Sequence, residues 1–290
     1  MEIIFFHVNV KVFTFLHPKH GLEYKYIINY PQVKRSYMNY EICCSKDGWL
    51  LLVGVNKSFQ FFFNPFTKED LPLPFEHKRI TNIRCFGMSH SPTSFDCVTV
   101  QLDNGSSTIT TVAYVHFLSE GVGDRISFKD LTFPHYSTSP AFHNGLFYFL
   151  ILTGKLAVIN PTRGEISWKV LEEPQAPCSS CFNNFLVECD GNLLAVFEIS
   201  LGKEGVRVFK LDESTMTWMK IESLKNHMLF VGKTSFSAVA NIPGLKSDES
   251  IKVINAHFTS SCLIIIALNL LSFLTTNNRR LFLFAISCFK

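Results

Sequence analysis

The chain has 290 residues, of which 47% are apolar and only 18% charged, with 29 phenylalanines and a formal net charge of +3. This length suits one large all-β domain, which buries roughly 75% of the unfolded chain's surface and so needs no disulfide bonds. The positive charge is not gathered into a Lys/Arg cluster, and the sequence therefore predicts no nucleic-acid partner.

The N-terminus and the cysteines together predict an intracellular protein. Residues Met1 to His7 lack the basic start and the small-residue cleavage site of a signal peptide. The nine cysteines are odd in number, and most lie in apolar runs, as Cys85, Cys97 and Cys189 do, where cysteine behaves as a small hydrophobe. We therefore expect reduced thiols and a cytoplasmic or nuclear location.

Three segments repeat one pattern, an Asp/Asn-Gly turn followed by an apolar run. They read Asp47-Gly48-Trp49 and onward to Val53, Asn144-Gly145 and onward to Leu150, and Asp190-Gly191 and onward to Val196. The last two glycines are 46 residues apart, and the first two are 97 apart, about twice that interval. A period of about 40–50 residues built from short strands is typical of β-propeller blades. Each glycine is expected in a tight turn with positive φ, immediately before a strand.

The doubled interval predicts a hidden blade near residue 95. Residues Phe95 to Val100 alternate like a strand, Asp103 to Ser106 supply a hairpin turn, and Thr108 to Phe117 form the returning strand. Residues Asp124 to Phe128 offer a third strand, and Ser235 to Ala240 are strand-like again. Blades near residues 48, 95, 145, 191 and 237 give about five recognisable units of four antiparallel strands, in an incomplete or atypical propeller.

Further along each repeat lies a second turn, followed by a strand that alternates as outer strands do. Asn-Pro begins this turn because proline presets its own φ and asparagine bonds the backbone just ahead. The repeat positions are Asn64 and Pro65, Asn160 and Pro161, and Asp212. Trp168 and Trp218 follow at matching positions, which favours core packing over a ligand-stacking role.

The C-terminus departs from the repeat. Residues Cys262 to Leu274 form a mostly apolar run of 13 residues, shorter than the roughly 17–25 that a membrane helix needs. A membrane association is therefore not expected, although a tail anchor stays open beside two alternatives. The run is either a replaced blade end packed as strand or helix, or sequence that arises from an error in the gene structure.

No motif in the chain indicates catalysis or a cofactor. Cys178 and Cys181 form a lone Cys-x-x-Cys in a proline-bounded loop, without the second ligand pair that a zinc site needs. The expected inner strands, 49–53, 146–150 and 193–197, are almost wholly apolar. An enzyme that uses the central channel should place ionisable groups there. The pattern favours a non-enzymatic interaction module, with loops on one face of a rigid scaffold as the binding elements.

The combined pattern resembles a plant propeller family found behind an F-box, the F-box-associated or F-box/kelch-repeat proteins. The matching segments are Gly48 to Leu52, Phe63 to Glu69, Leu71 to Pro74, Leu186 to Leu194, Val208 to Asp212, Trp218, and Ser235 to Ser237. In that family the F-box binds a Skp1-type adaptor of a cullin ubiquitin ligase, and the propeller is thought to hold the protein substrate. The resemblance therefore implies a protein substrate or partner, whose identity the sequence does not give.

Two departures from the family set the expected domain limits. Residues 1–23 are too short and too weakly helical for an F-box, residues 24–246 form the propeller, and residues 247–290 form a divergent hydrophobic tail. No direct contact with a Skp1-type adaptor is then expected from this chain. The alternatives to a substrate-binding module are a propeller enzyme that uses the central channel and a truncated paralogue without function.

Overall fold

The computed structural model shows an all-β protein, whose described residues include one short 3-10 helix, η1 (Leu118–Glu120). The residues that it describes are 4–9, 12–16, 23–27, 40–54, 60–64, 67–73, 83–104, 110–120, 122–129, 139–151, 153–177, 183–198, 206–224, 227–231, 235–239, 252–257, 262–267 and 284–285. Among these residues, no helix has the length and apolar character needed to cross a bilayer.

The strands form six four-stranded sheets. In chain order they are β1 (Ile4–Asn9), β2 (Val12–Leu16), β3 (Glu23–Ile27), β4 (Tyr40–Lys46), β5 (Trp49–Gly54), β6 (Gln60–Asn64), β7 (Glu69–Pro72), β8 (Ile83–Met88), β9 (Val98–Asn104), β10 (Thr110–Phe117), β11 (Val122–Lys129), β12 (Ala141–His143), β13 (Leu146–Leu150), β14 (Leu156–Asn160), β15 (Ser167–Val170), β16 (Asn183–Cys189), β17 (Asn192–Glu198), β18 (Val206–Asp212), β19 (Thr217–Ile221), β20 (His227–Val231), β21 (Phe236–Val239), β22 (Lys252–His257), β23 (Cys262–Ala267) and β24 (Phe284–Ala285).

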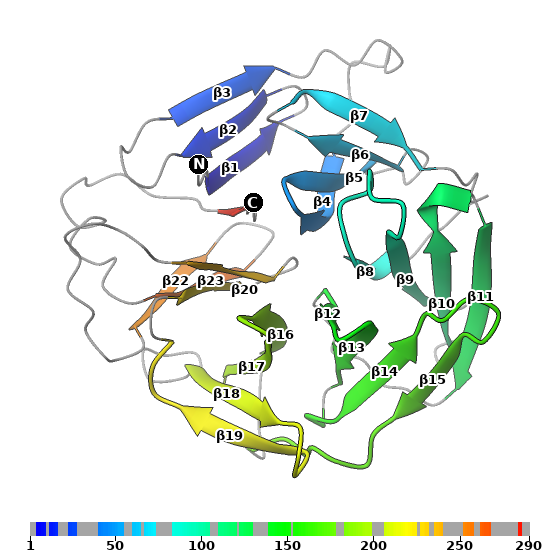
Figure 1. Ribbon diagram of the computed structural model, residues 1–290. Helices are drawn as coiled ribbons and strands as arrows, with labels where there is room; N and C mark the ends of the chain where they lie inside the picture. Colours follow the sequence, from blue (N-terminus) through cyan, green and yellow to red (C-terminus); the bar gives the residue numbers. More distant parts are fainter. Residues whose placement is uncertain are drawn as a thin grey trace.

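The six sheets stand as blades around a common axis (Figure 1), which confirms the propeller prediction. Four blades are simple meanders in sequence order: β4 to β7, β8 to β11, β12 to β15, and β16 to β19. Every strand pair between neighbours is antiparallel, as expected. The other two blades make the propeller atypical. One has the order β21-β20-β23-β22, and the other joins β24, from the end of the chain, to β1, β2 and β3.

The Asp/Asn-Gly turns join the first and second strands of three blades. Gly48, Gly145 and Gly191 have φ values of +80°, +79° and +70°, and the Asp or Asn before each also has positive φ. Two consecutive left-handed residues make a two-residue type I′ hairpin, whose twist matches that of the flanking strands. The register agrees, because Lys46 pairs with Trp49 and His143 with Leu146 across these turns. The prediction of positive φ at all three glycines is confirmed.

The strand that follows each of these turns is not the innermost strand. Figure 1 places β4, β12 and β16 nearest the axis, with β5, β13 and β17 second in their blades. The prediction that the apolar runs 49–53, 146–150 and 193–197 line the channel was therefore wrong. These runs are apolar because they lie between two neighbouring blades, so that both of their faces are buried.

Alternate residues of one second strand show this directly. In β17, Leu193, Ala195 and Phe197 pack with Leu150 and Leu156 of the preceding blade. Leu194 and Val196 face the other way and pack with Leu229 and Val231 of the following blade. Similar interfaces join β4 to β7 with β8, and β8 to β10 with β13 and β14. The hydrophobic core is thus a set of layers between blades.

The outermost strand β15 alternates between exposed and half-buried residues, as expected, and β19 does so except at Met219 and Lys220, which are both exposed. Trp168 in β15 and Trp218 in β19 are both partly buried and pack against interblade cores, which agrees with the core interpretation. The Trp218 indole Nε1 also donates a hydrogen bond to the carbonyl oxygen of Gly154 at 3.0 Å. Because Gly154 belongs to the neighbouring blade, this bond ties the two blades together.

The turns before the fourth strands share a side-chain cap. The Oδ1 atoms of Asn160 and Asp212 accept hydrogen bonds from the backbone N–H two residues ahead, at 3.1 and 3.0 Å. Asn64 accepts one from Thr67 N at 3.2 Å. Pro161 is buried beside Asn160, and Pro65 lies outside the described residues.

The hidden blade is present, with one correction. Strands β9, β10 and β11 pair in order, as predicted. However, β9 begins at Val98 instead of Phe95, and the blade opens with a strand, β8, that the repeat did not mark. The first connection of this blade is the long segment 89–97 in place of a two-residue turn.

Strands from both ends of the chain are also part of the blades. The apolar run that begins at Cys262 forms β23, which lies between β20 and β22 in one sheet. Strand β23 contains the first six residues of the run, 262–267; the later ones lie outside the described residues, and the alternatives for the run as a whole stay open. Segments on either side of residues 23 and 246 share sheets, and the domain limits drawn there stay predictions.

Candidate protein-binding face

One face of the propeller carries the connections that the structure describes best. In a four-stranded meander the connections alternate between the two ends of the strands, so the first and third connections of each blade emerge together. We call the face with these connections the turn face. It comprises residues 47–48, 67–68, 89–97, 118–120, 144–145, 161–166, 190–191 and 213–216. On the opposite face, the connections 55–59, 105–109 and 199–205 lie outside the described residues.

The blade formed by β8 to β11 is the third in chain order. Its first connection differs from its counterparts on the turn face. Where three other blades have a two-residue turn, this blade has a nine-residue loop, 89–97, between β8 and β9. Backbone bonds close it at both ends, since Ser89 N donates to Val98 O at 2.9 Å and Leu118 N donates to Cys97 O at 3.1 Å. The loop therefore begins and ends on strands of its own blade.

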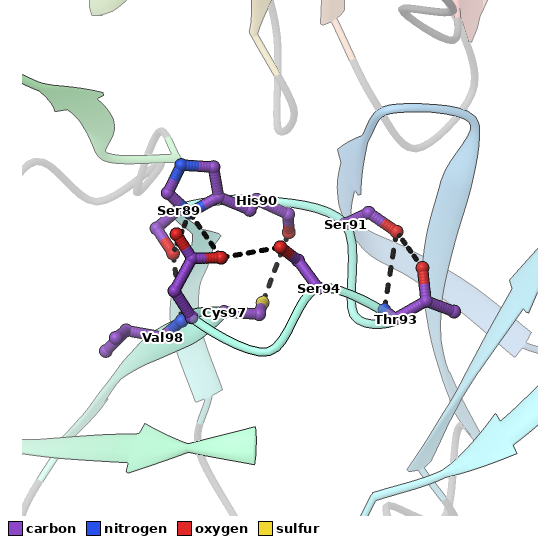
Figure 2. A network of polar contacts seen from close by, with 8 residues as sticks. Ser89, His90, Ser91, Thr93, Ser94, Cys97 and Val98 are labelled. Carbon is purple, nitrogen blue, oxygen red and sulfur yellow. Dashed lines mark hydrogen bonds and ion pairs between the residues drawn. The ribbon is translucent and has the colours of Figure 1, made fainter. Parts of the chain in front are cut away.

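Side chains within the loop hold its shape (Figure 2). The Ser89 hydroxyl oxygen accepts a hydrogen bond from Val98 N at 2.8 Å, and the Cys97 thiol donates to the His90 carbonyl at 3.2 Å. The Ser91 and Thr93 hydroxyls lie 2.7 Å apart and bond each other. Short polar side chains of this kind satisfy the backbone of an irregular segment and compete with regular structure for it.

A second set of contacts involves the end of the loop and its neighbour blade. The Ser94 hydroxyl donates to Asp96 Oδ1 at 2.5 Å, and His90 Nδ1 lies 3.9 Å from the same oxygen. The His90 ring meets the Phe142 ring of β12 edge to face, with centroids 5.5 Å apart. The loop is thus braced against the next blade as well as its own.

Phe95 occupies the exposed part of this loop. Its side chain is 83% exposed, whereas every other phenylalanine whose burial the structure describes is buried or half-buried. Single exposed apolar residues are common on protein surfaces and by themselves indicate nothing. Here, however, the aromatic ring is presented by a loop that many hydrogen bonds hold in one conformation. Ordered loops on rigid scaffolds are the usual binding elements of proteins.

Carboxylates predominate around this loop. The connections of the turn face carry five exposed carboxylates against two exposed cations, Lys68 and Arg163. The carboxylates are Asp47, Asp96, Glu165, Asp190 and Glu213. Because the whole chain has a net charge of +3, the negative charge of the turn face is a local feature. The connections nearest the axis carry Asp47, Asp96 and Asp190 and, among the described residues, neither Lys nor Arg.

The charge of two aspartates near this face is stabilised locally. The Ser94 hydroxyl and, secondly, the nearby His90 hold the pKa of Asp96 below its ordinary value. Hydrogen bonds from the Ser214 and Thr215 side chains do the same for the pKa of Asp212. Both groups are therefore anionic at neutral pH.

The loop residues Ser89, His90 and Asp96 do not form a catalytic arrangement. A Ser-His-Asp triad needs the serine and the carboxylate on opposite ring nitrogens of the histidine. In this loop, Ser89 Oγ at 3.1 Å and Asp96 Oδ1 both approach Nδ1 of His90. Burial raises the pKa of the Cys97 thiol to about 11, which keeps it protonated and unreactive at neutral pH.

Metal and redox chemistry find no support in the part of the chain that the structure describes. That part contains no group of three or more His, Cys, Asp or Glu side chains placed to hold a metal ion. Among the described residues, Cys43, Cys44, Cys85, Cys97 and Cys189 are buried thiols that form no disulfide bond. The predicted loop with Cys178 and Cys181 lies outside the described residues.

The sequence-predicted repeat positions are spread over the blades and do not converge. Gly48, Gly145, Asp190 and Gly191 lie in turns of the turn face, and Trp49 is a buried residue at the start of β5. Asn64, Asn160 and Asp212 end the third strands. They determine the scaffold, whereas the loop with Phe95 was not among the predicted positions.

The chain is similar to plant proteins of known domain type. The KIB1-4 beta-propeller family matches residues 16–249. An F-box/kelch-repeat protein of Arabidopsis thaliana is 30% identical, over 73% of this chain and 58% of the relative. A second F-box/kelch-repeat protein and an F-box protein of the same plant are each 28% identical, over 70% and 68% of this chain and 54% and 52% of the relatives. The chain thus spans little more than half the length of these relatives, and by the extent of the family match it belongs to the KIB1-4 beta-propeller family.

Proposed function

We propose that this protein is a protein-interaction module whose turn face docks a partner protein through Phe95. The observation that carries the proposal is the exposed phenylalanine on a loop with a hydrogen-bonded conformation. Aromatic residues are enriched in the centres of protein interfaces, where a few side chains supply most of the binding energy. The relatives, which are F-box and F-box/kelch-repeat proteins, support a role as a substrate-binding propeller of the ubiquitin ligase type.

Two contributions to the binding free energy, the burial of the aromatic ring and the ordering of the loop, both favour Phe95 as an anchor residue. Full burial of a phenylalanine side chain contributes about 1.5–3 kcal/mol relative to leaving it exposed. Ordering a flexible loop at an interface costs roughly 0.5–1.5 kcal/mol for each immobilised side chain. The bonds among Ser89, His90 and Cys97 hold the loop before any partner arrives, so most of that cost falls on folding.

Site-specific photo-crosslinking tests the docking surface. One variant carries p-benzoylphenylalanine in place of Phe95, and the matched control carries it in place of Met219, which is 48% exposed on the outer strand β19. In plant extract, the Phe95 variant should crosslink a discrete protein, and an excess of unlabelled wild-type chain should compete this product away. Identical products from both variants, or products that the wild-type chain does not compete, would contradict the proposal.

The ligase role has a separate test. The chain is fused to the F-box of one of its relatives, and the half-life of the crosslinked protein is measured in plant cells. We expect the fusion to shorten that half-life, and the same fusion with Phe95→Ser to leave it unchanged. If a partner binds the turn face but keeps its half-life, the proposal of an interaction module stands and the proposed role in ubiquitin transfer is refuted.

A further inference from the structure

Negative charge at the turn face is concentrated where a partner would meet Phe95. Three of the four meander blades have a carboxylate in their first connection: Asp47 between β4 and β5, Asp96 between β8 and β9, and Asp190 between β16 and β17. These connections are the ones closest to the axis. The two cations of the turn face, Lys68 and Arg163, lie in third connections, farther from the axis. Among the described residues, the first connections around the exposed ring of Phe95 thus contain aspartates but neither Lys nor Arg, although Lys46 ends β4 beside Asp47.

Turn chemistry does not account for this charge. The first left-handed position of a type I′ turn accepts Asn as well as Asp. Asn144 occupies that position in one blade with φ of +48°, and Asp47 and Asp190 occupy it in two others with φ of +48° and +51°. The same turn therefore forms with a neutral side chain, and the two aspartates add charge that the backbone does not require.

The third carboxylate is adjacent to Phe95 in sequence and is held in place. Asp96 accepts a hydrogen bond from Ser94, and its side chain is 68% exposed. An exposed aromatic ring with a fixed anion beside it matches a protein surface that offers both an apolar contact and a cation. Lysine and arginine supply both, because their methylene stems pack on apolar surface while the charged end reaches a carboxylate.

We propose that the partner segment docked on the turn face is basic: a Lys- or Arg-containing segment whose apolar atoms pack on Phe95 and whose cations face Asp47, Asp96 and Asp190. The proposal rests on the proposed function, because it specifies the partner of the same surface. Opposite charges on the two partners raise the association rate and discriminate against acidic competitors. The negative charge of the turn face thus favours the binding of cationic proteins over acidic ones.

Selection from a random peptide library tests the proposal without a known partner. A phage library of 12-residue peptides is panned on the wild-type chain after depletion on the Phe95→Ser variant, so that the peptides retained require Phe95. We expect these peptides to be enriched in Lys and Arg. Their affinity should fall when NaCl rises from 50 to 300 mM, because salt screens exposed charges.

Charge-neutral variants then identify the carboxylates responsible. The triple change Asp47→Asn, Asp96→Asn and Asp190→Asn should weaken the selected peptides roughly tenfold, since each exposed ion pair contributes only modestly. At positions 47 and 190 asparagine preserves the turns, as Asn144 shows, and thermal unfolding of the triple variant checks that the fold is kept. The matched control is Glu172→Gln, which removes an exposed carboxylate from the connection between β15 and β16 on the opposite face and should leave affinity unchanged.

The possible outcomes separate this inference from the proposed function. Retained peptides that are neutral or acidic, or whose affinity does not respond to the triple change, would overturn the basic partner and keep Phe95 as the docking residue. If no peptide requires Phe95 and the photo-crosslinking also yields no specific product, the docking surface itself is wrong. Retained basic peptides that respond equally to Glu172→Gln would show attraction to the whole molecule and would likewise refute the inference.

Discussion

The replacement of Gly154 by alanine should cost far more stability than the replacement of Gly191, although both glycines have nearly the same φ. Their φ values are +78° and +70°. At Gly191 a Cβ atom would have no heavy atom within 4 Å, whereas at Gly154 it would lie 2.3 Å from both the backbone N and the Cα of Ala176. The pair therefore separates backbone strain from close packing of the chain.

The expected magnitudes follow from these contacts. A left-handed alanine costs about 1–2 kcal/mol relative to glycine, and this is the whole effect expected at Gly191. At Gly154 the added atom must also displace Ala176. We expect this shift to break two hydrogen bonds, Ala176 N to Thr153 O at 2.9 Å and Trp218 Nε1 to Gly154 O at 3.0 Å. Overpacking costs about 1–3 kcal/mol and each lost hydrogen bond about 1 kcal/mol. With the left-handed strain included, the total at Gly154 is thus about 4–7 kcal/mol.

Urea denaturation followed by circular dichroism gives both free energies of unfolding. Gly191→Asn is the control, because asparagine tolerates left-handed backbone, as Asn144 does at the same position of another blade. It should lose less stability than Gly191→Ala. Equal losses for the two alanine variants would refute the argument that the linker at Ala176 packs directly on Gly154, and with it the importance of that contact for the joint between blades.

Three further predictions concern single side chains. Trp218→Phe keeps the ring against Phe197 but removes the donor to Gly154, and should lower the free energy of unfolding by about 1 kcal/mol in the same urea assay. Gln101 is fully buried and neither of its amide atoms has a hydrogen-bond partner among the described residues, so Gln101→Met should raise stability by about 1–2 kcal/mol, and a loss would indicate an ordered polar partner. Because burial raises the pKa of Cys97 from 9.0 to about 11, its stabilising contribution is complete below pH 9 and is lost as pH rises toward 11; the fall in melting temperature over that range should be shallower in Cys97→Ala.

The turns were predictable from the sequence because their signal is local. Two consecutive positive φ values favour Asn or Asp followed by Gly, and that dipeptide stands at residues 47, 144 and 190, between the first two strands of three blades. The first strand of the third blade, β8, was not predicted because no Asp/Asn-Gly turn follows it. The blade uses a loop whose conformation depends on contacts between Ser89, Cys97 and Val98, and such contacts leave no regular signature in the sequence.

Long-range pairing explains the other differences. Strand β24 pairs with β1 through Phe284 and Phe5, residues at opposite ends of the chain, and no local pattern marks such a pair. The mistaken choice of inner strands has a different cause. Apolarity reports burial on both faces, and in a propeller this condition holds for the second strand of a blade, between two neighbours, as β17 illustrates.

Phe95 was missed because its neighbours alternate like a strand. In the sequence, Phe95, Cys97 and Thr99 read as one face of an extended segment, and only the structure shows that β9 begins at Val98. That difference explains why an aromatic residue can be exposed at this point. A type I′ turn has two central residues, both with positive φ, a conformation that favours Asn, Asp and Gly and disfavours a bulky side chain. A blade can therefore present a large apolar side chain at the inner part of the turn face only by replacing that turn with a longer loop, and the third blade has made this replacement.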